Sequence, residues 1–493
     1  MRSVRGALSG RWAIFTRHVQ KCVAFFLMVA FLLPQMAGAI TIREENEVAV
    51  EFIKMVRARN RIIDDPVING YITGLGQKLL KFFPEQAFPY TFYVVESDVF
   101  NAFAGPGGHV FINSGLFEAL PNEESLAGIM AHEISHVHSR HISDRIDRSK
   151  KIGVGTLAGV AAGILVGVSG NAAAGGALAV GSLAGSHSAA LSFSREDEMQ
   201  ADQVGMTYLA EAGYGGDDML TALKTIREKQ WFGPAEIPTY LSTHPALEDR
   251  IAYIGNWLVA NREKVDAKRK KIDQSAFLKT KARITALFSP IETAEEKLTN
   301  AAKRGEASLY TEYGLGLLMN RRGKYEAAAA NMKSILAKRA FDFDAIKGLA
   351  QIYFNQGKSS QAHGLLTGVL SVNPTDFEAN MLMGEVLIDK GHYEAALRHL
   401  SPLASDYGPG GRAHYLLGNI FSHLKRPFES SYHLGLYYRS VGDLRNALFQ
   451  LERAETKAST VTAKREVEKA IESITGKKKK KKKETAERTS SSK

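Results

Sequence analysis

His132 and His136 lie four positions apart, and Glu133 directly follows the first of them. On an α-helix, residues i and i+4 share one face, so both imidazole rings can reach a single ion about 2.0 to 2.1 Å away. Glu133 would lie beside that ion, where a carboxylate can take a proton from an attacking water. The spacing therefore predicts a catalytic zinc site with one ion per chain. The alternative is a pair of surface histidines on an amphipathic helix, which would need no third ligand.

A third ligand is available further along the chain. Zinc peptidases with three histidines require Gly and His at the seventh and tenth positions after the first histidine, where this chain has Ser139 and Ile142. A second helix can supply a glutamate instead, and we expect Glu198 to be the third ligand. Asp202, one turn later, would accept a hydrogen bond from a ligand histidine and fix its tautomer. Glu196 is the competing ligand, but no acid lies four residues after it.

The histidine pair needs a helix, and the sequence predicts one. Asn122 is a favourable N-cap, and Glu123 and Glu124 would occupy the first turn, where the helix dipole favours acids. Apolar residues then recur at helical spacing, namely Leu126, Ile129, Met130, Ile134 and Val137.

The segment before this helix has a mixed pattern. Asp65-Pro66 begins a predicted helix, and Tyr90–Val95 is typical of a short strand. Ala104–Gly108 predicts a turn; a phosphate-binding loop is the weaker interpretation, because no Gly-Lys-Ser/Thr follows. The next predicted strand would offer an edge on which an extended substrate pairs through its backbone. That strand consists of His109, Val110, Phe111, Ile112 and Asn113.

Residues 152–194 contain no charged side chain. Two apolar pieces, Ile152–Ser169 and Ala172–Ser186, flank Gly170-Asn171, which predicts a helical hairpin. We favour a hairpin that covers part of the protein or lies at a membrane surface. Insertion into a membrane is the alternative, although the second piece is too short to span one.

The ends of the chain carry most of its charge. Residues 1–39 hold five basic residues and no acid, and 476–493 have a net charge of +7, so the rest of the +11 chain is nearly neutral. This excludes a broad nucleic-acid-binding face. The lysine-rich tail is expected to be disordered. The simpler interpretation is that the tail is a solvated, dispensable extension. The alternative is that it attaches electrostatically to anionic lipid.

The N-terminal segment is typical of a secretory signal peptide. Basic residues precede the short apolar run Cys22–Leu33, and Ala37-Gly38-Ala39 forms a small-residue cleavage site before Ile40. We therefore expect export to the periplasm, with an uncleaved membrane anchor as the alternative. Cys22 is the only cysteine, so the mature chain would contain no disulfide.

The C-terminal part contains a repeat of 34 residues. Gly323, Gly357 and Gly391 share this spacing, and each is followed five residues later by an alanine. The period predicts tetratricopeptide repeats over 307–455. Lys425 interrupts the glycine series and Gly442 resumes it half a period late, so we expect the last helices to be out of phase and to act as a cap.

These motifs resemble those of the zinc metallopeptidases that include the CAAX prenyl endopeptidases and the HtpX heat-shock protease. The resemblance covers about Asp65 to Arg250, including the Asn101–Ala104 segment. It implies a mainly α protein, with an α+β zincin-type metalloprotease domain followed by an all-α tetratricopeptide solenoid. The expected ranges are 1–39 signal peptide, 40–256 protease, 257–306 charged connector, 307–455 repeats and 456–493 terminal helix and tail.

Exported members of this class that carry such repeats act in quality control of outer-membrane β-barrel proteins. The resemblance therefore implies that unfolded or misassembled envelope proteins are substrates, and that the barrel-assembly machinery binds the repeats. It also suggests that the loop at His244-Pro245 lies over the zinc. His244 would then be a fourth ligand that keeps the enzyme latent, or would stabilise the oxyanion. The simpler alternative is a loop histidine, with Arg250 in a structural salt bridge, while His138 and His141 lie on the helix surface or behind the ligands.

Two rival functions remain open at this stage. One is a periplasmic chaperone or scaffold in which zinc only braces the fold. The other is a membrane-embedded prenyl-protein-type protease. Glu133 favours catalysis over the first, because a structural zinc has four closed protein ligands and no use for a neighbouring base.

Overall fold

The structure is a computed structural model that describes residues 40–151, 159, 161–162, 193–232, 244–305, 308–404 and 410–475. The predicted signal peptide, nearly all of the uncharged hairpin and the lysine tail lie outside these residues. The chain divides into Met1–Thr41 and Ile42–Lys493, and the fold described below belongs to the second unit. Among the described residues, no helix combines the length and apolarity needed to cross a membrane.

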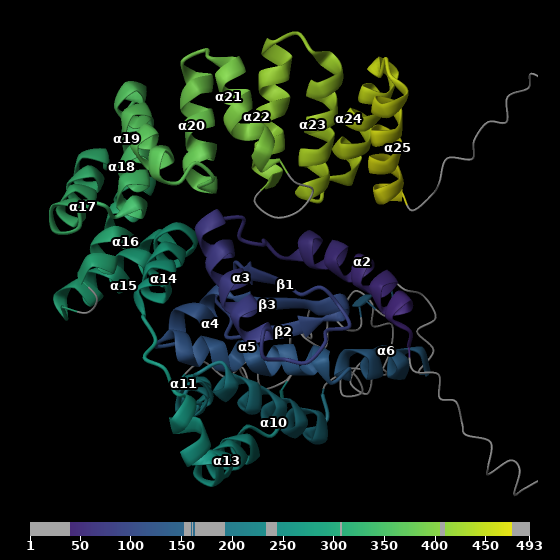
Figure 1. The fold of residues 1–493 in the computed structure, drawn as a ribbon, viewed down its shortest axis with the longest axis vertical. Helices are drawn as coiled ribbons and strands as arrows, with labels where there is room; N and C mark the ends of the chain where they lie inside the picture. Colours follow the sequence, from purple (N-terminus) through teal and green to yellow (C-terminus); the bar gives the residue numbers. More distant parts are fainter. Residues whose placement is uncertain are drawn as a thin grey trace, which may run out of the picture. The chain divides into compact units, whose positions relative to one another are not determined.

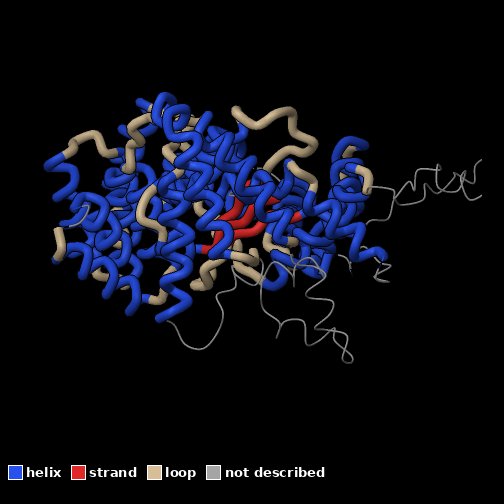
Figure 2. The backbone as a smooth tube through the Cα atoms, turned by 90° about the horizontal axis from the view of Figure 1, so that it is seen from below, coloured by secondary structure: helices blue, strands red, loops and turns tan. Residues whose placement is uncertain are grey.

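A small mixed sheet forms the centre of the peptidase part. It contains β1 (Thr91–Val95), β2 (Ala102–Gly105) and β3 (His109–Asn113) in the order β1-β3-β2. Strand β3 runs parallel to β1 and antiparallel to β2, and Figure 2 shows the strands surrounded by helices.

The predicted substrate edge at His109, Val110, Phe111, Ile112 and Asn113 is wrong. All five residues belong to β3, which pairs with β1 on one side and β2 on the other. Its backbone groups are already used within the sheet, so no extended substrate can pair with it. Among the described strands, β2 lies at an edge of the sheet and pairs with β3 only.

Helices cover both faces of the sheet. The peptidase part contains α2 (Ile42–Arg59), α3 (Pro66–Leu80), η1 (Pro106–Gly108), α4 (Ser114–Ala119), α5 (Glu123–His138), α6 (His141–Lys151), α10 (Arg195–Glu211), α11 (Asp217–Phe232) and α13 (Leu247–Lys268). Figure 1 shows α2 and α5 on opposite sides of the strands. Phe52 of α2 packs on Phe111 with ring centroids 6.0 Å apart. Phe52 also contacts Gly105, where an added Cβ would lie 2.4 Å from its ring.

Local sequence signals explain where the two key helices begin. Asp65 caps α3, its carboxylate accepting hydrogen bonds from the backbone N–H groups of Val67 and Ile68. Asn122 caps α5 in the same way, its side-chain oxygen accepting a hydrogen bond from the backbone N–H of Ser125. Both caps confirm the predicted helix starts. Every residue of α5 from Ser125 to Val137 is buried, so this helix runs through the core.

The predicted connector contributes to that core. Leu258 of α13, and Phe277 and Ile284 of α14, are buried in the same apolar cluster as α5. The helices that follow α13 are α14 (Ser275–Phe288), α15 (Ile291–Lys303), α16 (Ser308–Arg321), α17 (Tyr325–Lys338), α18 (Phe343–Asn355), α19 (Ser359–Val372), α20 (Phe377–Asp389), α21 (Tyr393–Leu400), η2 (Ser401–Leu403), α22 (Gly410–His423), α23 (Pro427–Ser440), α24 (Leu444–Lys457) and α25 (Val461–Thr475).

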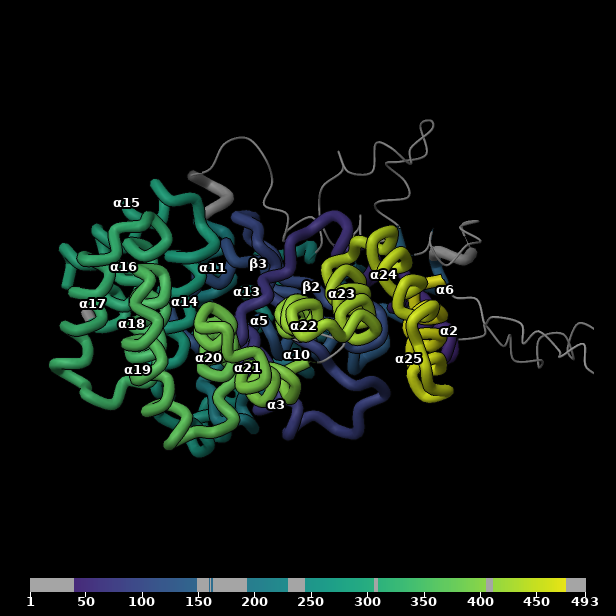
Figure 3. Tube along the Cα trace, turned by 90° about the horizontal axis from the view of Figure 1, so that it is seen from above, coloured from purple at the N-terminus to yellow at the C-terminus, as the bar shows by residue number. Residues whose placement is uncertain are grey.

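The repeat helices form successive antiparallel pairs, which Figure 3 shows side by side. Gly323, Gly357, Gly391 and Gly442 occupy the turns with φ of 72, 75, 74 and 82°, and Lys425 adopts the same conformation with φ of 56°. Glycine is the residue best suited to this left-handed region. The predicted repeat period is therefore confirmed, and Lys425 is the departure from it.

The predicted change of phase is also confirmed. Leu434 of α23 packs against Gly418 of α22, and Leu451 of α24 packs against Gly435 of α23. In both places an added Cβ would lie 2.7 Å from the leucine side chain. Helix α23 is thus the second helix of one pair and the first helix of the next.

Candidate metal centre

Helix α5 places three predicted residues together. His132, Glu133 and His136 are 1%, 0% and 0% exposed, and the Nε2 atoms of the two histidines lie 3.0 Å apart. One helical turn brings both rings to the same face. The alternative of two surface histidines is excluded by this burial.

Helix α10 supplies the carboxylate. Ser194 caps this helix in a capping box, so Glu198 follows in the first turn and Asp202 one turn later. Helices α5 and α10 approach closely at Gly205, where an added Cβ would lie 3.3 Å from the backbone of Ala131. Glu198 and Asp202 are 0% and 1% exposed and face α5.

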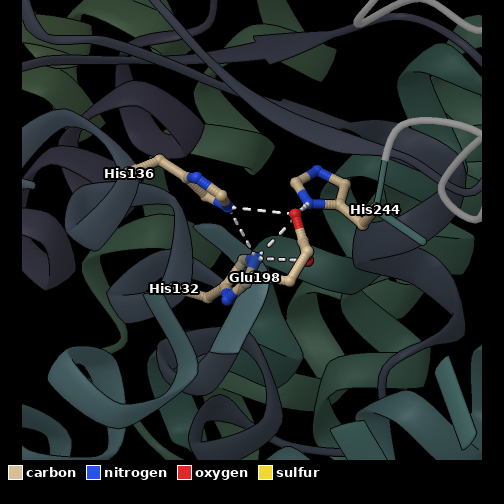
Figure 4. A group of neighbouring side chains, drawn as sticks. All are labelled: His132, His136, Glu198 and His244. Carbon is tan, nitrogen blue, oxygen red and sulfur yellow. Dashed lines mark hydrogen bonds and ion pairs between the residues drawn. The ribbon is translucent and has the colours of Figure 1, made fainter. Parts of the chain in front are cut away.

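His244 supplies another nitrogen from the loop before α13. Its side chain is fully buried. Nδ1 lies 3.0 Å from Oε1 of Glu198 and 3.3 Å from Nε2 of His132. Figure 4 shows His132, His136, Glu198 and His244 converging, and their ligand atoms all lie within 4.8 Å of one another.

The separations fit a bound zinc ion. Tetrahedral coordination with bonds of about 2.0 to 2.1 Å places ligand atoms about 3.3 Å apart. Glu198 Oε2 lies 3.4 Å from His132 Nε2, and Glu198 Oε1 lies 3.4 Å from His136 Nε2. The ligand nitrogen of His132 lies 3.0 Å from that of His136 and 3.3 Å from that of His244, and the His244 nitrogen lies 3.0 Å from Glu198 Oε1. The four groups therefore surround one point. Imidazole and carboxylate are donor types that zinc uses.

Asp202 and Arg250 hold His132 in the orientation that metal binding needs. The Nδ1–H of His132 donates to Oδ1 of Asp202 at 2.9 Å, so Nε2 is the nitrogen that faces the site. Arg250 donates to both oxygens of Asp202, at 2.7 and 2.8 Å, and its Nη1 lies 2.9 Å from Glu198 Oε2. The predicted role of Asp202 behind the ligands agrees with this geometry, and Arg250 bridges two of the acids.

A second chain of hydrogen bonds orients His136. Its Nδ1 lies 3.0 Å from Nδ1 of His141, and Nε2 of His141 lies 2.8 Å from Oε1 of Gln200. The Gln200 oxygen can only accept, so His141 carries its proton on Nε2 and accepts at Nδ1 from His136. Nε2 of His136 is then free to bind a metal. The sequence allowed a position for His141 behind the ligands, but it gave no indication of Gln200.

Burial and charge act against each other in this cluster. Burial alone would raise the pKa of Glu198, but His244, Arg250 and hydrogen bonds from both α5 histidines hold it well below its usual range. The pKa of Asp202 is lowered too, because Arg250 and His132 outweigh burial. Both carboxylates are therefore ionised and available to a cation and to its histidine ligands.

The two ligand histidines of α5 differ. Burial and the Arg250 charge oppose protonation of His132, but hydrogen bonds to Asp202 and Glu198 raise its pKa to about 9. Burial lowers the pKa of His136 well below its usual value. Metal binding at His132 must therefore displace a proton, whereas His136 is already neutral.

Glu133 is enclosed beside the ligands. It is 0% exposed, and neither carboxylate oxygen accepts a hydrogen bond from any residue that the structure describes. The nearby His244 Nε2 lies 3.5 Å from Oε1. A buried carboxylate costs free energy unless something satisfies it, and a water held between Glu133 and a metal would do so.

Glu196 and His138 were further candidates from the sequence, whereas Phe193 and Arg145 were not predicted. Glu196 is exposed on α10, so it does not compete with Glu198. His138 stacks edge-on with Phe83, with centroids 5.8 Å apart. The sequence did not reveal that Phe193 lies flat on His136 at 3.7 Å. Nor did it reveal Arg145, whose buried guanidinium lies 4.4 Å over Phe193 and whose pKa is lowered to about 9, mainly by burial.

The site combines two histidines on one buried helix, a glutamate on a second helix and the carboxylate of Glu133 beside them. This is the kind of site that zinc metallopeptidases use. A family model described as Peptidase family M48 matches residues 65–258, and one described as Tetratricopeptide repeat matches residues 347–397.

Curated proteins agree with this class. The beta-barrel assembly-enhancing protease of Yersinia pestis is 30% identical over 67% of this chain and 68% of that protein. The protein of the same name from Escherichia coli (strain K12) is 28% identical over 69% of this chain and 71% of its own length. The mitochondrial metalloendopeptidase OMA1 of Schizosaccharomyces pombe is 28% identical over 34% of this chain and 46% of its own. The chain belongs to peptidase family M48 and is a metalloendopeptidase.

Proposed function

We propose that this chain is an exported, zinc-dependent endopeptidase that acts on misassembled outer-membrane β-barrel proteins. The observation that carries the peptidase chemistry is the convergence of His132, His136 and Glu198 beside the buried Glu133. The β-barrel substrates come from the names of the relatives that share more than two thirds of their length with it.

The chemistry divides between the ion and the chain. Zinc, when bound, supplies a Lewis acid for the scissile carbonyl and lowers the pKa of water. His132, His136 and Glu198 would hold it. Glu133 takes the proton of the attacking water and returns it to the leaving nitrogen, since no other carboxylate lies beside the ligands on α5.

His244 keeps the site closed. Its Nδ1 lies 3.0 Å from Oε1 of Glu198, close to the separation expected for two ligands of one ion. A catalytic site would leave that fourth position to water or substrate. We therefore favour the fourth-ligand role over the oxyanion role. Replacing His244 with alanine should raise cleavage of an unfolded protein several-fold, whereas a fall in cleavage at unchanged zinc content would favour the oxyanion role.

The substrate pairs with β2 rather than with β3. Strand β2 ends the sheet beside α5, and an extended polypeptide could continue the ladder there. All four residues of β2 are buried in the described state, which agrees with a closed site that must open before substrate enters.

The N-terminal segment supports the proposed location, and the repeats support the proposed partners. The N-terminal segment directs export to the periplasm, where unfolded envelope proteins would be encountered. Peripheral contact with a membrane remains part of this proposal. The repeats would bind partner proteins, including the barrel-assembly machinery, because such arrays present extended binding surfaces.

The decisive experiment compares Glu133→Gln with wild type. The variant should retain zinc in full, because the side chain at position 133 is not among the proposed ligands. It should lose cleavage of an unfolded outer-membrane protein by at least about a hundredfold. Glu196→Gln, an exposed change on α10, is the matched control and should cleave normally. Unchanged cleavage by Glu133→Gln would overturn the proposed role of Glu133.

One observation favours a second candidate function. Four protein ligands around one ion are typical of a structural zinc, and His244 completes such a set here. A repeat-bearing chaperone with structural zinc would prevent aggregation of unfolded proteins without cleaving them. Under that function, Glu133→Gln would leave holding activity intact, His244→Ala would lower the zinc content and the stability of the fold, and no peptide product would appear.

A further inference from the structure

The repeat region contains a basic pocket of about 250 Å³ between α22, α23 and α24. These three helices lie side by side (Figure 3). The pocket is lined by four cationic side chains, Lys425, Arg426, Arg453 and Lys457, together with the hydroxyl groups of Ser430 and Ser431.

Among the described residues, no carboxylate side chain lines the pocket. Arg426 is balanced by Glu429, whose Oε1 lies 2.6 Å from its Nη2. Within the part of the chain that the structure describes, no acid lies at ion-pair distance from Lys425, Arg453 or Lys457. The nearest polar contact of Lys457 is the buried Ser431, at 3.5 Å. The pocket therefore presents an excess of positive charge beside the hydroxyl group of Ser431.

Two departures from the repeat pattern meet at this pocket. The turn position that is glycine in the other helix pairs is Lys425, held in the left-handed region with φ of 56°. The position five residues later, alanine after Gly323, Gly357 and Gly391, is Ser430. Its hydroxyl donates to the carbonyl of Gly418 at 2.9 Å. Glycine would remove the backbone strain, so packing and turn geometry do not account for Lys425.

The helix dipole explains only part of the charge. Arg453 and Lys457 lie toward the C-terminal end of α24, where cations are favourable. Arg426 is instead the N-cap of α23, where a cation is unfavourable, and no side chain caps the backbone N–H groups there. A helix N-terminus next to several cations attracts an anion.

We propose that this pocket binds a phosphate ester. A phosphate monoester carries a charge of about −1.5 to −2 and three strong acceptor oxygens, which matches several cations and a hydroxyl donor better than the single charge of a carboxylate. The pocket volume leaves room for the group and part of the moiety that bears it. A soluble phosphate monoester and the headgroup of phosphatidic acid share this chemistry. The proposal is independent of the peptidase function.

Calorimetry and flotation on the full chain distinguish the two sources. Glycerol 3-phosphate is titrated at fixed ionic strength, and flotation uses vesicles of phosphatidylcholine with or without phosphatidic acid. Binding of glycerol 3-phosphate in solution identifies a soluble ester. Flotation with phosphatidic acid that Arg453→Gln with Lys457→Gln abolishes, without measurable binding of the free ester, identifies a lipid headgroup. Flotation that this pair leaves unchanged reflects the lysine-rich tail and overturns the pocket as the site. Binding in neither assay overturns the proposal.

Paired variants test the residues. Arg453→Gln with Lys457→Gln should weaken binding at least about tenfold, because charge-assisted hydrogen bonds are the strong ones. Arg445→Gln with Lys464→Gln removes the same charge from exposed positions outside the pocket lining and should change binding less than twofold. Equal losses in both pairs would mean a diffuse charge effect and would overturn the site.

Lys425→Gly is the sharpest single test. It restores the turn residue of the other pairs, so the melting temperature should rise while phosphate-ester binding falls. Cleavage of an unfolded protein should stay unchanged, which separates this result from any failure of the peptidase proposal. A rise in melting temperature with undiminished binding would remove Lys425 from the site. Displacement of the ester by an acidic peptide would instead assign the pocket to polypeptide carboxylates.

Discussion

Asp202 controls which nitrogen of His132 faces the metal. Its Oδ1 accepts the Nδ1 proton at 2.9 Å, and Nη2 of Arg250 lies 3.2 Å from the same Nδ1. A guanidinium can only donate. In Asp202→Ala, Arg250 would donate to Nδ1, and the ring proton would move to Nε2, the atom that must bind zinc.

The expected loss of zinc affinity is large. Removing a group that orients a metal ligand typically costs about 10- to 100-fold, or roughly 1.4 to 2.8 kcal/mol. We expect about a hundredfold for Asp202→Ala, because Arg250 then imposes the wrong tautomer. About tenfold is expected for Asp202→Asn, whose amide oxygen still accepts one hydrogen bond.

Competition with a chromogenic chelator gives the zinc affinity, and circular dichroism of the metal-free protein shows that each variant is folded. Gln203→Ala, an exposed change on the same helix, is the matched control. Asp202→Ala combined with Arg250→Met removes the donor that imposes the wrong tautomer, so this double variant should bind zinc more tightly than Asp202→Ala alone. Weaker binding by the double variant, or an affinity of Asp202→Ala within threefold of wild type, would refute the reasoning.

Two further predictions concern a ligand partner and pH. Gln200→Leu should weaken zinc binding about tenfold, since His141 loses its acceptor at 2.8 Å, and Gln200→Glu should restore it in the same chelator competition. Burial, helped by the Arg57 charge, lowers the pKa of His109 from 6.5 to about 4. The unfolded chain therefore binds more protons between these values, and stability is lost as pH falls through that window. His109→Gln should reduce the loss between pH 7 and pH 5 by about 2 kcal/mol, measured by urea unfolding; an identical pH dependence in both proteins would contradict this.

The features that the sequence predicted well are those with local causes. Asp65 and Asn122 mark helix starts because a cap acts on the next turn, and the spacing of His132 and His136 fixes their shared face. Glu198 was predicted from helical spacing too, because Asp202 lies one turn after it. The repeat period, and even its break at Lys425, could be read from glycine spacing because each turn imposes its own backbone conformation.

The features that the sequence did not predict depend on distant pairing. Strand order is set by contacts across the chain, so β3 could be recognised as a strand but not as the central one. His141 and Gln200 are 59 positions apart in the sequence and lie on different helices, so no local pattern indicates their contact. Arg145 lies one turn after His141 on α6, a spacing that could have indicated a basic residue facing the same way.

From the arrangement around His244 we infer how the proposed closed site could open without losing its metal. Arg250, on α13, binds Glu198 and Asp202, whereas His244 precedes that helix and is joined to it through Ala246. Ala246 has φ of 63°, a left-handed conformation that costs a residue with a side chain about 1 to 3 kcal/mol. We expect the backbone to change at Ala246 when His244 withdraws, because relief of this strain offsets part of the lost ligand bond. Arg250 would stay in place and keep the other three ligands oriented.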